Sequence, residues 1–465
     1  MKGEVTAEEL QLRRDFRDVT TFTIDPLTAK DFDDAISLKN LPDGQIEIGV
    51  HIADVTHYLK EGTALDKEAL KRSTSVYLVD RVCPMLPEKL SNDLCSLNPN
   101  EDKFTFSAVF VFDADRKITQ EWFGKTIIHS DRRFTYEEAQ ERLETGTGDF
   151  AKELLILNSV ALKLRSERYA EGSISFDSEE VQFILDETGM PQGMYVRERK
   201  DAHMLVEDFM LLANKMVATY IAKKSKPEIP FIYRIHDLPN PDKLADFALF
   251  ARELGFNFRM DKPEQITESF NQLAIAAKEN VALKLLEPLA IRTMAKAVYS
   301  TNNIGHYGLG FEYYTHFTSP IRRYSDVLVH RGLFKNLTQI TREDKELLEQ
   351  KAKHISDQEK KASEAEREST KYFQTLYISS FIGQEFDGVI SGIIEKGIFV
   401  ELLESKVEGL VTFDSMGELF YVPTSRLKAT SRISGQEFFM GQSIRVKITA
   451  ADPDTRRTDM ELVME

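Results

Sequence analysis

The sequence predicts a large mixed α+β domain followed by a small all-β barrel. Three observations along the 465 residues lead to this fold class. Residues 20–60 alternate apolar and polar side chains as strands do, whereas helical periodicity dominates residues 135–170 and 200–375. From Phe381 onward, short alternating runs are separated by glycines, which is typical of a small antiparallel barrel.

The first elements are expected in this order. Residues 6–17 form a short helix, because Thr6 is a favourable N-cap and Glu9 follows at the spacing of a capping box. Strands then cover residues 20–60, including the run IEIGVHIADVTHYL. A strand pair, KFTFSAVFVFD and ITQEWFGKTIIHS, follows and is joined by a turn at residues 114–116.

The later elements fix the domain boundaries. Residues 341–371 are rich in Glu and Lys at i,i+4 spacing, which is typical of a long solvent-exposed helix. The character of the sequence changes near Tyr377, where glycine-punctuated strands begin. We therefore expect a lead-in helix within residues 1–19, a large domain at 20–376 and a barrel domain at 381–465.

Composition narrows the class of protein. The chain is 42% hydrophobic and 29% charged, has no apolar run long enough for a membrane span, and begins without the apolar core of a signal peptide. Its only cysteines, Cys83 and Cys95, make a disulfide scaffold or a cysteine zinc site improbable and fit a reducing cytoplasm. A net charge of −16 argues against a broadly basic surface for duplex nucleic acid, but it allows cationic side chains inside a channel.

Four aspartates near the N-terminus are the strongest candidates for chemistry: Asp25, Asp31, Asp33 and Asp34. Like charges this close raise one another's pKa unless a cation lies among them, and hard divalent ions take oxygen ligands. In an extended chain Asp34 would point away from Asp31 and Asp33, so a turn is needed to converge them. Apolar runs flank the cluster and Phe32 interrupts it, which argues against a solvated acidic loop. The residues alone leave a metal site and an acidic loop open.

Several segments, in the same order, resemble the RNase II/RNase R (RNB) family of exoribonucleases. They span residues 20–375 and read TIDPLTAKDFDDAIS, GVHIADVTHYL, STSVYLVDRVCPMLPEKLSNDLCSL and GHYGLGFEYYTHFTSPIRRYSDVLVHR. ISF at residues 174–176 and FTSPIRR are closer to the RNase R branch than to the RNase II branch. The resemblance implies the RNB fold for the large domain, and the barrel resembles an S1 RNA-binding domain of the OB-fold class.

The resemblance implies processive 3′→5′ hydrolysis of single-stranded RNA to 5′-nucleoside monophosphates. Divalent-metal catalysis, with Mg2+ or Mn2+, would use ions held by Asp25, Asp31, Asp33 and Asp34. Asp33 matches the family's most critical catalytic acid. Arg322 matches its catalytic arginine, whose planar fork of donors suits phosphate oxygens.

The resemblance also implies a set of RNA contacts. Tyr77 and Phe176 match aromatics that stack on bases. Tyr136 and Glu207 match positions that contact ribose, which an enzyme must do to choose RNA over DNA. Glu207 lies among apolar residues expected to be buried, so its carboxylate needs a partner. Arg323 is expected to have a structural or a phosphate-contacting role.

The barrel departs from the S1 pattern. Residues 381–465 contain 4 Lys and 5 Arg against 5 Asp and 9 Glu, a net charge of −5. The segment GLVTFDSM also lacks the His-Ile-Ser that often follows Gly-Leu-Val in S1 domains. Phe386, Phe399 and Lys396 are the candidate RNA contacts of the barrel, and burial in the barrel core is the alternative for the two phenylalanines.

Two other functions compete with an exoribonuclease. One is a non-catalytic RNA-binding protein that retains the fold, and the other is a DNA exonuclease. Retention of all four aspartates and of Arg322 favours the enzyme. Members of the RNase R type usually carry N-terminal cold-shock domains and a basic tail, so the sequence is expected to be a fragment or a short member. We expect a cytoplasmic monomer that binds single-stranded RNA and no membrane.

Overall fold

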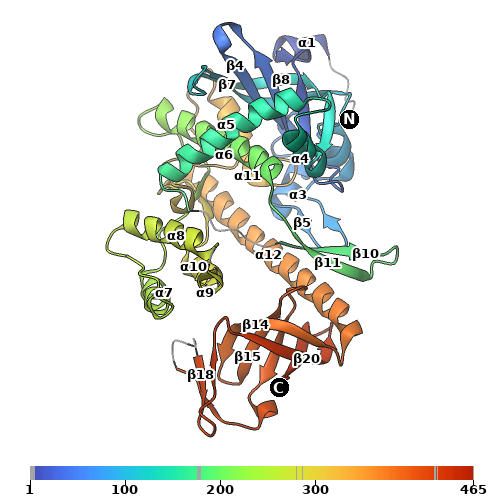
Figure 1. The fold of residues 1–465 in the computed structure, drawn as a ribbon. Coiled ribbons are helices and arrows are strands. Elements are labelled where there is room, and N and C mark those ends of the chain that lie inside the picture. The colour runs from blue at the N-terminus through green and yellow to red at the C-terminus, as the bar shows by residue number, and fades with distance from the viewer. Residues whose placement is uncertain are drawn as a thin grey trace.

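The computed structural model describes residues 6–174, 180–278, 280–284, 286–423, 426 and 428–463. A large mixed α/β part and a C-terminal barrel lie at opposite ends of one long helix, α12 (Lys345–Ile378) (Figure 1). No helix within the described ranges is both long enough and apolar enough to cross a membrane.

A seven-stranded sheet is the frame of the large part. Its strand order is β1-β8-β7-β4-β3-β2-β9. The strands are β1 (Arg14–Phe16), β2 (Thr21–Asp25), β3 (Asp34–Asn40), β4 (Ile46–Ala53), β7 (Asp102–Phe112), β8 (Ile118–His129) and β9 (Arg132–Thr135). β7 and β8 form the expected antiparallel pair. Every residue of β4 is buried, as expected for a strand covered on both faces.

The N-terminal segment differs from the expectation. Helix α1 spans only Ala7–Gln11, and the chain then enters strand β1. Thr6 caps the helix by accepting from the Glu9 backbone N–H, but the Glu9 carboxylate binds the Arg13 side chain instead of closing a capping box. Arg13 also donates to the buried carboxylate of Asp54 at 2.8 Å. This buried ion pair holds the chain against the sheet directly after the helix.

Helices pack against the sheet and also form a separate lobe. Those nearest the sheet are α2 (Val55–Tyr58), α3 (Ala64–Arg72), α4 (Tyr136–Thr145), α5 (Ala151–Ala170), α6 (Asp201–Lys224) and α11 (Tyr324–Lys335). The helical lobe has its own core and consists of α7 (Pro241–Glu253), α8 (Pro263–Ala277), α9 (Val281–Lys284) and α10 (Leu286–Thr293). Figure 1 shows this lobe beside α12.

Short strand pairs lie outside the seven-stranded sheet, and the last of them interrupts a segment expected to be helical. They are β5 (Val76–Tyr77) with β6 (Val82–Cys83), β10 (Glu180–Leu185) with β11 (Pro191–Arg197), and β12 (Tyr233–Ile235) with β13 (Val298–Ser300). The helical periodicity of residues 200–375 is therefore broken at β12 and β13. The extended segment after β13 carries the second group of site residues.

The C-terminal part is the expected barrel with an added sheet. Five strands close in the order β14-β15-β16-β21-β20. They are β14 (Glu385–Ile394), β15 (Gly397–Leu402), β16 (Glu408–Thr412), β20 (Ser443–Asp452) and β21 (Arg457–Leu462). A three-stranded sheet extends from the barrel between β16 and β20, and consists of β17 (Phe420–Tyr421), β18 (Lys428–Ser431) and β19 (Glu437–Phe439).

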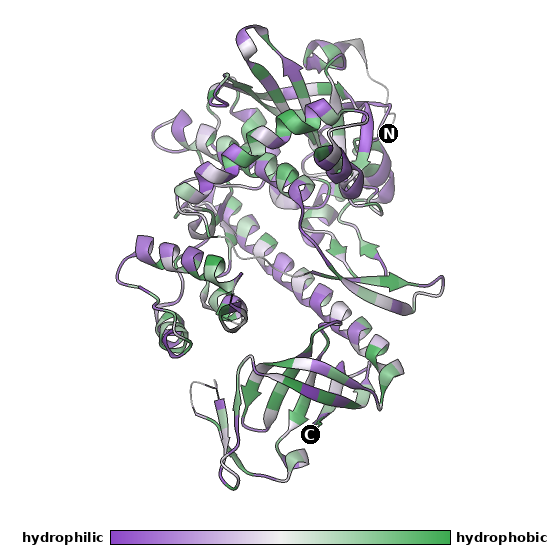
Figure 2. Cartoon of the chain, in the orientation of Figure 1, coloured by the Kyte–Doolittle hydropathy of each residue, from purple (hydrophilic) through white to green (hydrophobic). Residues whose placement is uncertain are grey.

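Helix α12 binds other parts of the chain through its polar side chains. Hydrophilic residues recur along it, as the exposed-helix expectation requires (Figure 2). Three of its carboxylates nevertheless accept hydrogen bonds from distant segments. The donors are the Thr301 backbone N–H for Glu349, the Arg234 side chain for Glu359, and the Tyr77 backbone N–H for Glu366. The helix is therefore an internal support as well as an exposed surface.

Candidate active site

The four aspartates lie where the chain passes between two neighbouring strands. Asp25 ends β2 and Asp34 begins β3, and residues 26–33 between them form an irregular loop. This loop supplies the expected turn. The buried Phe32 anchors it, because its backbone N–H donates to Ser96 Oγ at 3.0 Å and its side chain enters the core.

Asp25 and Asp34 are held in a desolvated environment. Burial, together with the charge of Asp34, raises the pKa of Asp25 to about 8. Burial raises the pKa of Asp34 to about 6, against the opposing effect of Arg322. Oδ2 of Asp25 is buried and has no hydrogen-bond partner among the described residues. Two such carboxylates, one with an unused oxygen, fit a divalent cation, which would stabilise their ionised forms.

Asp33 connects the aspartate segment to the distant segment that contains Ile321 and Arg322. Its side chain is buried, with a residue exposure of 5%. Oδ1 accepts from the backbone N–H of Ile321 at 2.9 Å, and Oδ2 lies 3.8 Å from Nε of Arg322. Burial raises the pKa of Asp33 well above its usual range, although Arg322 and the Ile321 N–H oppose the shift. A buried carboxylate therefore faces the arginine expected to act on phosphate.

Asp31 lies on the more open side of the loop and contacts the expected base clamp. Its Oδ2 accepts from the hydroxyl of Tyr77 at 3.2 Å. Tyr77 is 40% exposed, and burial of its hydroxyl end and the charge of Asp31 raise its pKa. The aromatic ring thus stands at the rim of the aspartate cluster.

The geometry does not gather all four aspartates around one point. Among the residues that the structure describes, no three or more Asp, Glu, His or Cys side chains are arranged to hold one metal ion. Mg2+ commonly takes only one or two carboxylates and completes its shell with water and substrate phosphate. The pair Asp25 and Asp34 is therefore the core of the candidate metal site, and ligation by Asp31 or Asp33 stays a prediction.

The two neighbouring arginines have different surroundings. Arg323 is mostly buried and donates from Nε and Nη2 to both oxygens of Asp326, at 2.9 and 2.8 Å. Arg322 is 42% exposed at the side chain and donates to Ser319 Oγ at 3.1 Å. Arg322 is thus placed to donate to a phosphate beside Asp33. Arg323 was expected to have either a structural or a phosphate-contacting role. Because its guanidinium is buried and paired with Asp326, the structural role is favoured.

Tyr136 is supported by a histidine that the sequence analysis did not single out. The rings of Tyr136 and His203 are stacked, with centroids 4.0 Å apart and an interplanar angle of 11°. Arg197 also lies over the Tyr136 ring, at 5.4 Å from its centroid. Asp25 pairs with Thr135 in the sheet, directly before Tyr136, and burial together with the charges of Asp34 and Asp25 raises the pKa of Tyr136.

His203 is a neutral support for that tyrosine. Its Nδ1 accepts from the backbone N–H of Lys200 at 3.2 Å, and burial lowers its pKa to about 4. The hydrogen of the neutral ring is therefore on Nε2, which has no partner among the described residues. His203 lies one helical turn before Glu207 on α6, and this spacing was the available sequence signal.

Glu207 differs from the expectation. Its side chain is 37% exposed and pairs with Arg199, so the required partner is a cation of the chain itself. Met204 and Met210 beside it are only partly buried. The other expected base clamp, Phe176, lies outside the described residues.

The barrel candidates are divided between core and surface. Phe386 packs partly against the barrel core and against the ring of Phe381, which matches the alternative of core burial. Phe399 is half-buried on β15, and Lys396 is exposed.

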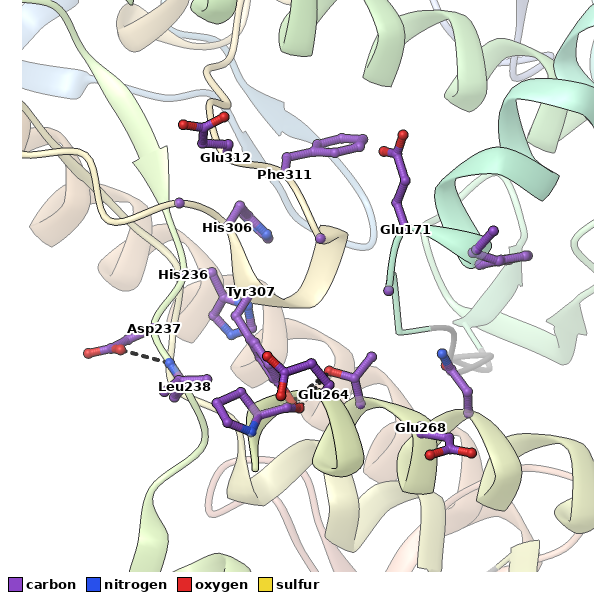
Figure 3. A pocket seen from close by; sticks show the side chains of 18 of the residues that line it. Glu171, His236, Asp237, Leu238, Glu264, Glu268, His306, Tyr307, Phe311 and Glu312 are labelled. Carbon is purple, nitrogen blue, oxygen red and sulfur yellow. Dashed lines mark hydrogen bonds between the residues drawn. The ribbon is translucent and has the colours of Figure 1, made fainter. Parts of the chain in front are cut away.

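A cavity of about 1030 Å³ lies away from these residues, between the helical lobe and the segment after β13. Figure 3 shows Glu171, Glu264, Glu268 and Glu312 around it, together with the paired rings of His236 and His306. Its lining includes no Lys or Arg and none of the predicted site residues. The cavity lining offers no cation to bind phosphate, whereas Arg322 lies 3.8 Å from Asp33, so the aspartate cluster, and not this cavity, is the candidate active site.

Comparison with known proteins follows the same division of the chain. Residues 13–339 match the family model of the RNB domain. The chain belongs to the RNB family. Residues 379–462 match the S1 RNA binding domain, which covers the barrel and its added sheet. The RNB domain thus contains the candidate site residues from Asp25 to Arg323, and the barrel candidates lie within the S1 match.

Curated relatives of this RNB protein are named Ribonuclease R. The protein from Aquifex aeolicus is 39% identical over 99% of the chain, and the match covers 66% of the relative. Ribonuclease R 1 from Lactococcus lactis is 38% identical over 98% of the chain, with 57% of the relative covered. The chain therefore spans somewhat less than two thirds of these relatives.

Solved structures share the fold over nearly the whole chain. Mycoplasma genitalium RNase R in complex with ribose methylated single-stranded RNA superposes with a TM-score of 0.90 at 30% identity, over 99% of this chain and 73% of that one. Yeast Ssd1, described as a pseudonuclease, shares the fold with a TM-score of 0.74 at 23% identity.

Proposed function

We propose that the chain is a metal-dependent 3′→5′ exoribonuclease that degrades single-stranded RNA processively to 5′-nucleoside monophosphates. The observation that carries the proposal is the meeting of two distant motifs at one buried carboxylate. Asp33 accepts from the Ile321 N–H at 2.9 Å and lies 3.8 Å from Arg322, although the bonded residues are 288 positions apart. Relatives named Ribonuclease R, and an RNase R structure with single-stranded RNA, support the same reaction.

The side chains divide the work of cleaving a phosphodiester. Asp25 and Asp34 would hold Mg2+ or Mn2+, which supplies an activated water and neutralises phosphate charge. Asp33 orients or deprotonates the attacking water from its buried position. Arg322 donates to the phosphoryl oxygens as negative charge grows on them.

Other residues position the RNA. Tyr77 stacks on a base at the rim and holds Asp31 through its hydroxyl. Phe176 is proposed to stack on the terminal bases. Tyr136 contacts ribose close to the metal pair, and Glu207, released from Arg199, contacts a neighbouring ribose. These roles explain how the enzyme would accept any sequence and still require RNA.

A labelled-RNA assay tests the reaction. 5′-labelled poly(A) with Mg2+ should give a few-nucleotide end product without a ladder of intermediates, because a processive enzyme finishes one strand before it releases it. EDTA should stop the reaction. Random internal cuts, or activity that survives EDTA, would contradict the proposal.

The second candidate function is a non-catalytic RNA-binding protein with the same fold. Yeast Ssd1 shares the fold, so the fold alone does not establish catalysis. Retention of the four aspartates and of Arg322 favours the enzyme. RNA that is bound but never shortened, under the conditions of the same assay, would identify the non-catalytic protein.

Comparing RNA with DNA as substrate distinguishes the proposed exoribonuclease from a DNA exonuclease. A DNA strand of matched sequence should bind, because stacking does not use the 2′-hydroxyl, but it should resist cleavage.

We further propose that the chain acts as a cytoplasmic monomer, which its two unpaired cysteines and its bacterial relatives support. Light scattering of the purified chain measures the oligomeric state.

A further inference from the structure

The sheet β17–β19 has one buried face and one exposed face. In the antiparallel register Tyr421 pairs with Thr430, and Lys428 pairs with Phe439. Paired residues, and residues two apart on a strand, share a face. Tyr421, Thr430, Lys428, Glu437 and Phe439 therefore all lie on the same face.

The opposite face belongs to the core. Ala429 and Phe438 are almost fully buried, and the Phe420 ring stacks on Phe413 with centroids 4.3 Å apart. This packing fixes the sheet on the barrel. By contrast, Tyr421 is 54% exposed and Phe439 is 45% exposed. The two exposed rings are thus displayed on a rigid support, and burial in the core does not explain them.

The exposed rings lie on a locally basic surface. Residues 418–442 contain three basic residues, Arg426, Lys428 and Arg432, against two acidic residues, Glu418 and Glu437, within a barrel domain of net charge −5. Arg432 lies over the Tyr421 ring, 5.9 Å from its centroid. Lys428 makes a 3.3 Å ion pair with Glu437, and both residues are at the surface. Phosphate would therefore meet Arg426 and Arg432 here, whereas Glu437 partly neutralises Lys428 and the domain as a whole is acidic.

The spacing of the rings suits a single strand. They lie diagonally across the central strand β18, which places their Cα atoms about 12 Å apart. Exposed aromatics on sheet strands, flanked by cations, are how sheet surfaces bind single-stranded nucleic acid without reading its sequence. Met440, directly after β19, packs against both the barrel core and the helical-lobe core, so this sheet lies where the barrel meets the large part (Figure 1).

We propose that Tyr421 and Phe439 form a stacking platform for single-stranded RNA, with Lys428 and Arg432 contacting its phosphates. The platform is separate from the barrel residues Phe386, Phe399 and Lys396 considered above. It rests on the proposed function, because RNA must be the polymer that the chain engages. It explains how an acidic S1 domain can still hold RNA.

Binding measurements on a catalytically inactive Asp33→Asn chain test the platform. The double change Tyr421→Ala and Phe439→Ala should weaken binding of a long oligoadenylate by at least about 5-fold for each ring removed. A matched DNA strand should lose affinity by the same factor, because stacking ignores the 2′-hydroxyl. In chains that keep Asp33, cleavage of a short oligoadenylate that occupies only the large part should be unchanged.

Matched variants separate stacking from folding and from charge. Tyr421→Trp keeps a stacking ring and should keep affinity. Ile433→Ala removes an aliphatic side chain that is 71% exposed and cannot stack, so it should change nothing. Lys428→Gln with Arg432→Gln should make the slope of log K against log salt shallower by about 0.7 for each phosphate that these cations no longer neutralise. Equal melting temperatures for all variants show that the sheet remains folded.

Two outcomes would overturn the platform, and they differ. If the parent chain degrades RNA but the double alanine variant binds long RNA as tightly as the parent, the platform is wrong while the proposed function stands, and the face would fit a protein partner. If the parent chain neither binds nor degrades RNA, the proposed function itself fails.

Discussion

Single residues set the chemistry that this chain can perform, and Asp33 is the most constrained of them. Its carboxylate is buried, accepts a backbone N–H from the arginine segment, and faces Arg322. The amide of Asn has nearly the same shape and can still accept that N–H through its carbonyl oxygen. The charge can therefore be removed without removing the contact.

We expect Asp33→Asn to lower turnover by about 10²-fold or more while RNA binding and melting temperature remain near those of the parent. Single-turnover cleavage and fluorescence anisotropy on the same RNA measure the two quantities. Turnover close to that of the parent would show that another aspartate is the catalytic acid.

The raised pKa of Asp25 predicts a pH dependence. Its folded pKa of about 8 lies above the ordinary aspartate value, so between about pH 4 and 8 the folded state holds a proton that the unfolded state has lost. This contribution to stability is complete below about pH 4 and is lost as the pH rises through about 8. Without divalent ions, the melting temperature should fall over this range more in the parent than in Asp25→Asn.

Mg2+ should reverse the loss, because it favours the ionised carboxylates. Its stabilising effect should therefore grow as the pH rises, and Asp25→Asn should show little of it. Differential scanning calorimetry with Mg2+ or with EDTA measures both effects. A stabilisation by Mg2+ that is equal at low and high pH would contradict this use of Asp25.

His203 predicts a second effect at the level of one residue. His203→Ala removes the ring stacked on Tyr136, whereas His203→Phe keeps a ring. If the stack holds Tyr136 toward ribose, the ratio of kcat/KM for RNA to that for DNA should fall about 5–10-fold in His203→Ala. Rescue by His203→Phe is the control, and loss of activity without a change in the ratio would indicate a merely structural role.

Among the elements, the segment before α11 shows how neighbouring residues acquire different roles. Arg323 and Asp326 form a buried, two-pronged ion pair at i,i+3 spacing, which ties the segment to the first turn of the helix. Arg322 then points toward Asp33. The paired Arg323 thus holds Arg322, the proposed phosphate contact, in place.

Alanine substitutions should separate the two arginines. Arg323→Ala leaves the buried Asp326 unpaired and should destabilise the fold by about 3–5 kcal/mol. Arg322→Ala, at a half-exposed position, should leave the melting temperature nearly unchanged and mainly lower kcat. Urea unfolding and steady-state kinetics measure these effects, and the reverse pattern would exchange the two assignments.

At the scale of the whole molecule, net charge limits how the proposed RNA substrate can be held. With a net charge of −16, the chain cannot attract RNA through its overall field, so affinity must come from stacking and a few local cations. We expect a shallow salt dependence, with log K against log salt no steeper than about −3, which corresponds to about four phosphate contacts. A much steeper slope, measured by titration at several salt concentrations, would instead indicate a continuous basic path for the RNA backbone.

The global architecture could be predicted from the sequence, because ordered motifs specify it, and the same motifs supplied the candidate reacting residues, whose roles stay a prediction. Local periodicity could not predict the contact between Asp33 and Arg322, because that contact depends on how the loop after β2 and the segment before α11 are arranged in space. Glu207 has a partner, as expected, but the sequence did not indicate which one, because Arg199 lies outside the helix.

Neither the contacts of α12 nor the sheet β17–β19 could be predicted from local sequence patterns. The charged repeat of α12 suggested a purely solvated helix, yet Glu349, Glu359 and Glu366 bind other segments. Composition records that a side chain is polar but not which group it faces. The sheet β17–β19 has strands of two to four residues, which are too short for alternation to stand out.

The contacts along α12 have a mechanical consequence. Glu366 and Ser369 hold the hairpin that carries Tyr77, while Gln374 holds the barrel by donating to the Lys406 carbonyl. These points lie within eight residues, or about 12 Å of helix. The hairpin and the barrel are therefore both attached to the same short stretch of α12. Because a helix changes its length very little, the distance between the barrel and the hairpin would stay nearly constant. An RNA strand bound at both places would therefore remain extended between them while its 3′ end is shortened.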